Sequence, residues 1–129
     1  MECLDTTFII DLLKNKTEAI KKASEIKEEF IVTTTTNVFE VLQGFYFESN
    51  QKKIDIVNNF LSTVGILPLD FTASAKAAEI RVDLMKKGKD INVLDSLIAG
   101  TMLTNNCNTI ITRNKDHFER VKGIKVESY

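Results

Sequence analysis

Short runs of aliphatic and β-branched residues alternate along this chain with longer segments that carry apolar residues at helical spacing. The two clearest strand-like runs are residues 30–34 and 109–112, and weaker ones are residues 1–4, 66–70 and 124–126. Strands that alternate with helices in this way pair in parallel, and the helices cover both faces of the sheet. The pattern therefore predicts an α/β fold with a central, mostly parallel sheet of four to five strands.

The expected helices mostly follow side chains that can cap a helix. They are residues 8–13, 17–28, 38–45, 51–63, 72–87 and 93–103. Thr6 or Thr7 is expected to cap the first of these helices, Thr35, Thr36 or Asn37 the third, and Asn92 the last. We expect one domain over residues 1–129, because the length fits a single domain and the 43% of hydrophobic residues suffices for a core.

Composition restricts the function classes. A net charge of -1 argues against a protein that coats nucleic acid by bulk charge, although a bound cation can supply the missing positive charge at one site. Charges interrupt the apolar runs too early for a membrane span. The two cysteines, Cys3 and Cys107, match no metal or redox spacing and are interpreted as buried thiols. Few cysteines and no signal sequence indicate the cytoplasm.

Three acidic residues stand where a parallel sheet places its ligands, at strand ends and in the following helix turns. Asp5 ends the first strand, Glu40 lies early in the helix after the second, and Asp95 lies early in the helix that starts at Asn92. Each has an ordinary alternative as a helix cap, a surface charge or a first-turn carboxylate. Asp95 lies among apolar residues, where a carboxylate needs a cation or hydrogen bonds to compensate it.

Several carboxylates in one pocket repel one another unless a cation lies between them. Mg²⁺ and Mn²⁺ take oxygen ligands, and such ions promote the hydrolysis of a phosphodiester. The sequence therefore predicts a metal-dependent site at Asp5, Glu40 and Asp95. Arg113 and Lys115, which follow the strand at residues 109–112, are expected to hold the phosphate backbone that flanks the scissile bond.

Four segments carry a family resemblance: residues 4–13, 36–41, 88–100 and 110–118. In this order and spacing they resemble the four motifs of PIN-domain ribonucleases, particularly the VapC-like toxins of type II toxin–antitoxin systems. The resemblance implies a three-layer α/β/α fold, with Asp5, Asp95 and Glu40 as ligands of Mg²⁺ or Mn²⁺. It leaves the fourth acidic position open between Asn114 and Asp116. We favour Asp116 as the acid.

Other polar residues are expected to support the site or to lie outside it. Asn114 is interpreted as a supporting polar group, and Thr6 and Thr7 are expected to bond to Asp5. Asp11 is interpreted as a surface charge, and His117, the only histidine, as a structural or surface side chain.

The resemblance further implies an RNA substrate such as tRNA, rRNA or mRNA, a small cognate antitoxin protein as partner, and a homodimer. A PIN nuclease for housekeeping RNA processing is the first alternative. A catalytically inactive RNA- or protein-binding module is a second, because Asn114 offers only a neutral oxygen. A receiver-like signalling domain is a third, but it needs adjacent acidic residues after its first strand, where Asp5 stands alone.

Overall fold

The computed structural model describes residues 1–26 and 30–129. Within these residues, five parallel strands form one sheet in the order β3-β2-β1-β4-β5. The strands are β1 (Glu2–Leu4), β2 (Ile31–Thr34), β3 (Gly65–Leu67), β4 (Thr109–Ile111) and β5 (Lys125–Glu127). The helices are α1 (Thr6–Leu13), α2 (Thr17–Glu25), α3 (Thr35–Phe47), α4 (Gln51–Leu61), α5 (Phe71–Lys86), α6 (Val93–Thr104) and α7 (Lys115–Glu119).

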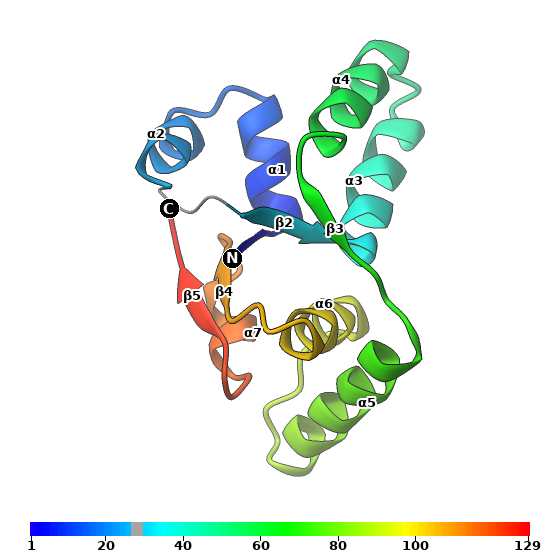
Figure 1. The fold of residues 1–129 in the computed structure, drawn as a ribbon, viewed down its shortest axis with the longest axis vertical. Coiled ribbons are helices and arrows are strands. Elements are labelled where there is room, and N and C mark those ends of the chain that lie inside the picture. Colours follow the sequence, from blue (N-terminus) through cyan, green and yellow to red (C-terminus); the bar gives the residue numbers. More distant parts are fainter. Residues whose placement is uncertain (27–29) are drawn as a thin grey trace.

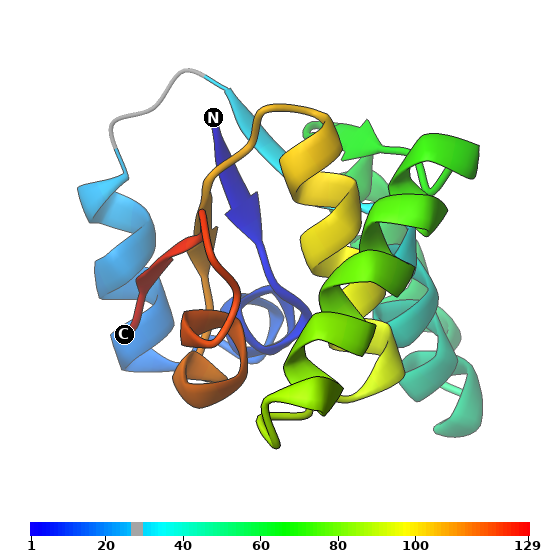
Figure 2. The ribbon, with the colours of Figure 1, turned by 90° about the horizontal axis from the view of Figure 1, so that it is seen from below.

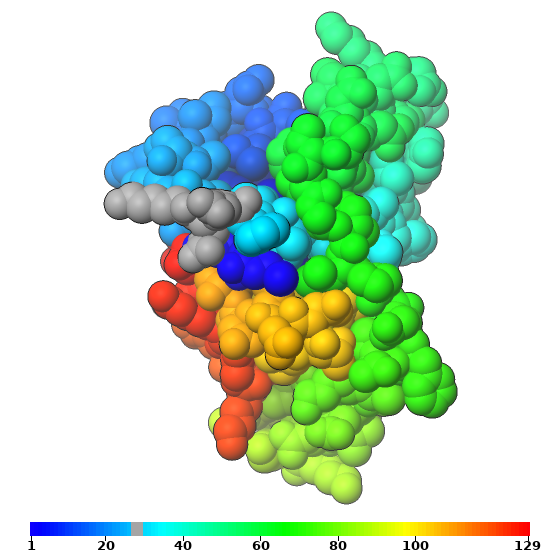
Figure 3. Space-filling view, in the orientation of Figure 1, coloured from blue at the N-terminus to red at the C-terminus, as the bar shows by residue number. Residues whose placement is uncertain are grey.

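The helices form a layer on each face of the sheet, so the predicted α/β/α arrangement is confirmed. Helices α1 to α4 lie on one face and α5 to α7 on the other, with α6 between the sheet and α5 (Figures 1 and 2). The space-filling view shows α4 and α5 as two lobes on one side of the molecule, joined by the segment that contains β3 (Figure 3). None of the helices in the described ranges is long and apolar enough to cross a membrane.

The two-residue period of the strands divides the core between these faces. In β1, Leu4 packs with the cluster under α1 to α4, while its neighbour Cys3 packs with α6 and α7. In β4, Ile111 packs with the same cluster as Leu4, and Ile110 packs with the same cluster as Cys3. Cys3 and Cys107 are both buried free thiols, as predicted.

Several predicted boundaries differ from the structure. Strand β3 ends at Leu67 rather than at residue 70, because Pro68 has no N–H with which to continue a ladder. Helix α3 is capped by Thr34, one residue before the expected caps, because the Thr34 hydroxyl accepts a hydrogen bond from the backbone N–H of Asn37. Helix α2 ends at Glu25; residues 27–28 of the predicted helix lie outside the described residues.

The strand order places β1 in the centre of the sheet and reverses the direction of winding there. The chain leaves β1 toward β2 and β3 on one side and then crosses back to β4 and β5 on the other. In open parallel sheets, ligands bind beyond the carboxyl ends of the strands at such a switch point. The residues that follow β1 and β4 therefore mark the place for a site.

Candidate active site

Asp5 follows β1 directly and lies at this switch point. Its side chain occupies the N-cap position of α1 but makes no capping hydrogen bond. One carboxylate oxygen, Oδ2, accepts a hydrogen bond of 2.6 Å from Thr112 Oγ1, which follows β4, and one of 3.3 Å from Thr7 Oγ1. The cap interpretation of Asp5 is therefore wrong, because the carboxylate is bonded across the sheet instead.

Burial governs the electrostatics of Asp5, which is only 3% exposed. Desolvation raises the pKa of this carboxyl, the hydrogen bond from Thr112 opposes that effect, and the nearby charge of Asp95 adds to it. Asp5 is therefore a buried carboxyl whose charged form needs compensation.

Asn37 holds the other oxygen of Asp5, a role that the sequence analysis did not assign to it. Its amide Nδ2 donates to Asp5 Oδ1 and to Thr6 Oγ1, both at 3.0 Å. Its Oδ1 accepts from Thr34 Oγ1 at 2.7 Å and, at 3.3 Å, from the backbone N–H of the same residue. The reciprocal bonds between Thr34 and Asn37 form a capping box. The cap of α3 thus fixes the position of the first carboxylate.

Glu40 lies one turn further along α3 and reaches the same place. Its Oε1 accepts a hydrogen bond of 2.8 Å from Thr6 Oγ1, whereas the predicted bond of Thr6 to Asp5 is made by the Thr6 backbone. Burial raises the pKa of Glu40, and the charges of Asp5 and Asp95 raise it further, against the opposing effect of the Thr6 hydrogen bond. The effect of the Asp5 and Asp95 charges on Glu40 indicates that the three carboxylates lie near one another.

Asp95 comes from the opposite helical layer. Asn92 caps α6 by accepting a hydrogen bond of 2.8 Å from the Asp95 backbone N–H, as predicted, which sets the carboxylate in the first turn. Asp95 is 6% exposed, and its Oδ2 accepts from Asn114 Nδ2 at 2.9 Å and lies 2.7 Å from His117 Nδ1. The contact with His117 was not anticipated.

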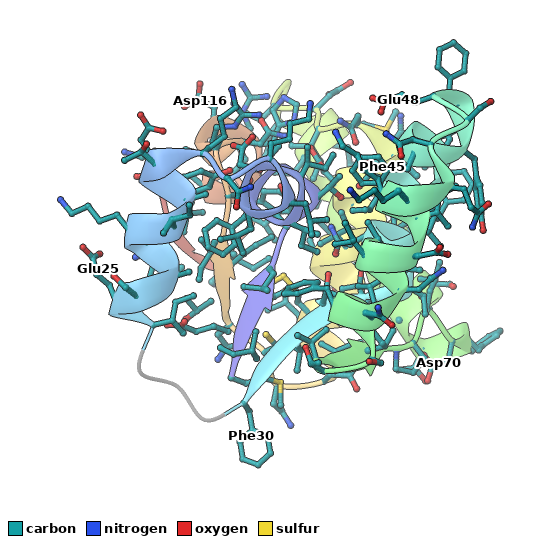
Figure 4. The ribbon with its side chains drawn as sticks, turned by 90° about the horizontal axis from the view of Figure 1, so that it is seen from above. Glu25, Phe30, Phe45, Glu48, Asp70 and Asp116 are labelled. Atoms are coloured by element: carbon teal, nitrogen blue, oxygen red, sulfur yellow. The ribbon has the colours of Figure 1, made fainter. Side chains whose placement is uncertain are left out.

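Asn114 and Asp116, the two candidates for the fourth polar position, lie in different surroundings in the segment after β4. Asn114 contacts Asp95, whereas Asp116 is exposed on α7. Figure 4 shows Asp116 at the edge of the molecule where the strands end, opposite Phe30 at the edge where they begin. The predicted role of Asp116 as the fourth acid finds no supporting contact in the described residues.

Arg113 and Lys115, the predicted RNA contacts, differ in how they are held. The guanidinium Nε of Arg113 lies 3.0 Å from Asp11 Oδ2, and Tyr129 Oη donates a hydrogen bond of 2.8 Å to the same oxygen. Asp11 is 4% exposed, so its interpretation as a surface charge is wrong. The Arg113 side chain is itself 57% exposed, whereas Lys115 pairs with Glu119 on the surface at 3.6 Å. Asp11 therefore holds one exposed cation beside the site.

The donor set suits a hard divalent cation. The candidate ligands are carboxylate oxygens, and a cation beside Asp5 and Glu40 would offset the burial and the like-charge repulsion that raise their pKa values. In the part of the chain that the structure describes, no three His, Cys, Asp or Glu side chains stand close enough to hold an ion by themselves. Mg²⁺ commonly retains several water ligands when proteins bind it.

The fold and this site define the class of protein. The model of the PIN-domain family matches residues 3–124, and the chain belongs to that family. Within the family it is VapC-like. It is 27% identical over 127 residues to the tRNA(fMet)-specific endonuclease VapC of Salmonella typhimurium, and 24% identical over the same length to that of Shigella flexneri; each match covers 98% of this chain and 96% of the relative.

Solved structures agree. A DNA-bound VapBC from Salmonella typhimurium superposes with a TM-score of 0.84 at 26% identity, covering 98% of this chain and 96% of that one. VapBC2 from Rickettsia felis, bound to a promoter DNA fragment, gives 0.83 at 25% identity and covers 99% and 98%.

Proposed function

We propose that this chain is a metal-dependent endoribonuclease that hydrolyses RNA phosphodiester bonds at Asp5, Glu40 and Asp95, with Mg²⁺ or Mn²⁺ as cofactor. The observation that carries the proposal is the convergence of three carboxylates from three separate elements at the switch point of the sheet. Two of them have raised pKa values, and perturbed groups of this kind cluster at functional sites. The names of the two VapC relatives support nuclease activity.

The side chains have distinct roles in this mechanism. A bound cation would supply positive charge to the scissile phosphate and favour deprotonation of the attacking water. Asn37 and Thr112 hold the Asp5 carboxylate in one orientation, with one hydrogen bond to each of its oxygens. Glu40, which Thr6 fixes through Oε1, would orient the attacking water through its other oxygen.

Arg113 completes the site on its outer side. Its guanidinium is oriented by the buried Asp11 and remains more than half exposed, which suits a contact with a phosphate that flanks the scissile bond. A single oriented arginine agrees with the net charge of -1, because the chain has no basic surplus to bind RNA along its length. Structured RNA, with tRNA first, is the substrate class to test.

We further propose that the chain is the toxin of a VapBC-type pair, inhibited by a small antitoxin, and that it acts in the cytoplasm as a homodimer. Structures of VapBC complexes among its neighbours support the antitoxin. Large exposed apolar side chains offer surface for protein partners: Tyr46 and Phe47 on α3, Phe71, Val82 and Met85 on α5, and Val93 on α6. Light scattering after gel filtration tests the dimer.

The nuclease is tested by incubating the untagged protein with tRNA, rRNA and mRNA fragments in Mg²⁺, in Mn²⁺ and in EDTA. We expect cleavage that requires the metal and is lost in Asp5→Asn and Asp95→Asn. Asp55→Asn, an exposed carboxylate of α4, serves as the matched control and should cleave as the wild type does. Equal cleavage in EDTA or by the two site variants would contradict the proposal.

A further inference from the structure

Arg113 and Tyr129 follow two paired strands at the same edge of the sheet. Ile111 of β4 is in register with Glu127 of β5, and each of the two residues comes two positions after its strand. The ion pair of 2.9 Å between Lys22 and Glu127 ties the end of β5 to α2. Parallel pairing therefore brings a guanidinium and a phenol to the edge of the sheet that carries the acidic site.

A single carboxylate oxygen joins these two side chains. Asp11 Oδ2 accepts a hydrogen bond of 2.8 Å from Tyr129 Oη and lies 3.0 Å from Arg113 Nε. The tyrosine ring packs edge-on against the buried ring of Phe8, with the centroids 4.9 Å apart. Burial and the contact with Asp11 raise the pKa of Tyr129, so its hydroxyl keeps its proton and donates it. The ring thus fixes the hydroxyl, and the hydroxyl fixes the oxygen that holds the guanidinium.

The backbone of Arg113 is held by α1 as well, the helix that carries Asp11. The Arg113 N–H donates to Thr7 Oγ1 at 3.1 Å, and the Thr7 hydroxyl donates to Asp5 Oδ2 at 3.3 Å. Thr7 and Asp11 are four residues apart and therefore lie on one face of α1. The guanidinium consequently has a fixed position relative to the first carboxylate of the acidic site.

We infer that Tyr129 is a positioning residue for RNA binding: through Asp11 it holds the Arg113 guanidinium ready for the phosphate that flanks the scissile bond. An arginine side chain has many rotamers, and fixing one of them on binding costs free energy. The contacts with Asp11 and Tyr129 fix the rotamer in the free protein, while the Arg113 side chain stays 57% exposed. The inference rests on the proposed function, because it concerns the binding of the same RNA substrate.

Nuclear magnetic resonance measures the order of the guanidinium directly. The sequence contains three arginines, so ¹⁵N-labelled protein gives few Nε–Hε signals, and Arg113→Gln identifies the signal of Arg113. Tyr129→Phe keeps the ring against Phe8 and removes only the hydroxyl. We expect the heteronuclear NOE of the Arg113 Nε to fall in Tyr129→Phe, which reports faster motion, and to stay unchanged in Asn50→Ala, which removes the cap of α4. An unchanged NOE in Tyr129→Phe would overturn the inference.

A double-mutant cycle extends the test to cleavage of the tRNA, rRNA or mRNA fragment that the wild type cleaves. Tyr129→Phe should raise KM about two- to tenfold with little change in kcat, because a flanking phosphate is bound alike in the ground and transition states. Arg113→Gln should raise KM about tenfold or more, and adding Tyr129→Phe to it should raise KM no further. Asp11→Asn, the second variant, should also raise KM only when Arg113 is present.

The cycle separates positioning from a purely structural role. If Tyr129→Phe raises KM by the same factor with and without Arg113, the tyrosine supports only the fold, and the inference is overturned while the proposed nuclease stands. Loss of order at Arg113 with no change in KM would overturn it too. If the wild type cleaves none of these RNAs, the proposed function and this inference fail together.

Discussion

Removing the side chain of Asn37 tests whether the cap of α3 holds the first carboxylate of the site. Asn37→Ala deletes four hydrogen bonds in a side chain that is fully buried. The bond to Asp5 is charge-assisted and contributes about 1.5–3 kcal/mol, and the 2.7 Å bond from Thr34 contributes about 1 kcal/mol. With the weaker bonds, the free energy of unfolding should fall by about 3–5 kcal/mol.

Asn50→Ala is the matched control, because Asn50 caps α4 through a bond of 3.1 Å from the Lys53 amide and does not contact the acidic site. Its loss should cost about 1 kcal/mol. Urea unfolding of both variants, followed by circular dichroism, measures the difference, and metal-dependent RNA cleavage should fall only in Asn37→Ala. Equal destabilisation of the two variants, or full cleavage by Asn37→Ala, would refute the role assigned to Asn37.

Three further predictions concern packing, the chain end and pH. In Gly100→Ala the new Cβ would lie 2.6 Å from the Ala77 backbone nitrogen, so urea unfolding should show a loss of about 3 kcal/mol, whereas Gly44→Ala, with open space around it, should gain about 0.5–1 kcal/mol. Tyr129→Phe removes a donor to the buried Asp11 and should cost about 1.5–3 kcal/mol, against less than about 0.5 kcal/mol for the exposed Tyr46→Phe. The pKa values of Asp5 and Glu40 are raised in the folded state, so the stability that these groups contribute is complete below about pH 4 and is lost as pH rises through the raised values. Unfolding in EDTA at several pH values should therefore show that the free energy of unfolding of Glu40→Gln rises relative to that of the wild type as pH increases. A difference between the two proteins that does not change with pH would contradict this reasoning.

The sequence was sufficient to predict the sheet and the placement of three carboxylates at one edge of it, because strand ends and first helix turns occupy one edge of a parallel sheet. Asp5, Glu40 and Asp95 are the residues at those positions. Their partners were harder to predict. Asn37 bonds to Asp5 from 32 residues away, and His117 meets Asp95 across 22 residues, so neither contact follows from a local pattern.

Weak signals for these partners do exist. Thr34 and Asn37 have the three-residue spacing of a capping box, and His117 follows Asn114 by three residues, which puts both on one side of a helical turn. The error at Asp11 has another cause. Its compensating partners, Arg113 and the last residue of the chain, Tyr129, come from distant segments that only the fold brings together.

The location of the bound metal tests the central claim most directly. Crystals of the protein soaked in Mn²⁺ should give their strongest anomalous difference peak among the carboxylates of Asp5, Glu40 and Asp95, and Asp95→Asn should weaken it. Mn²⁺ found only at exposed carboxylates such as Asp116, with no peak between the three buried and half-buried ones, would contradict the account.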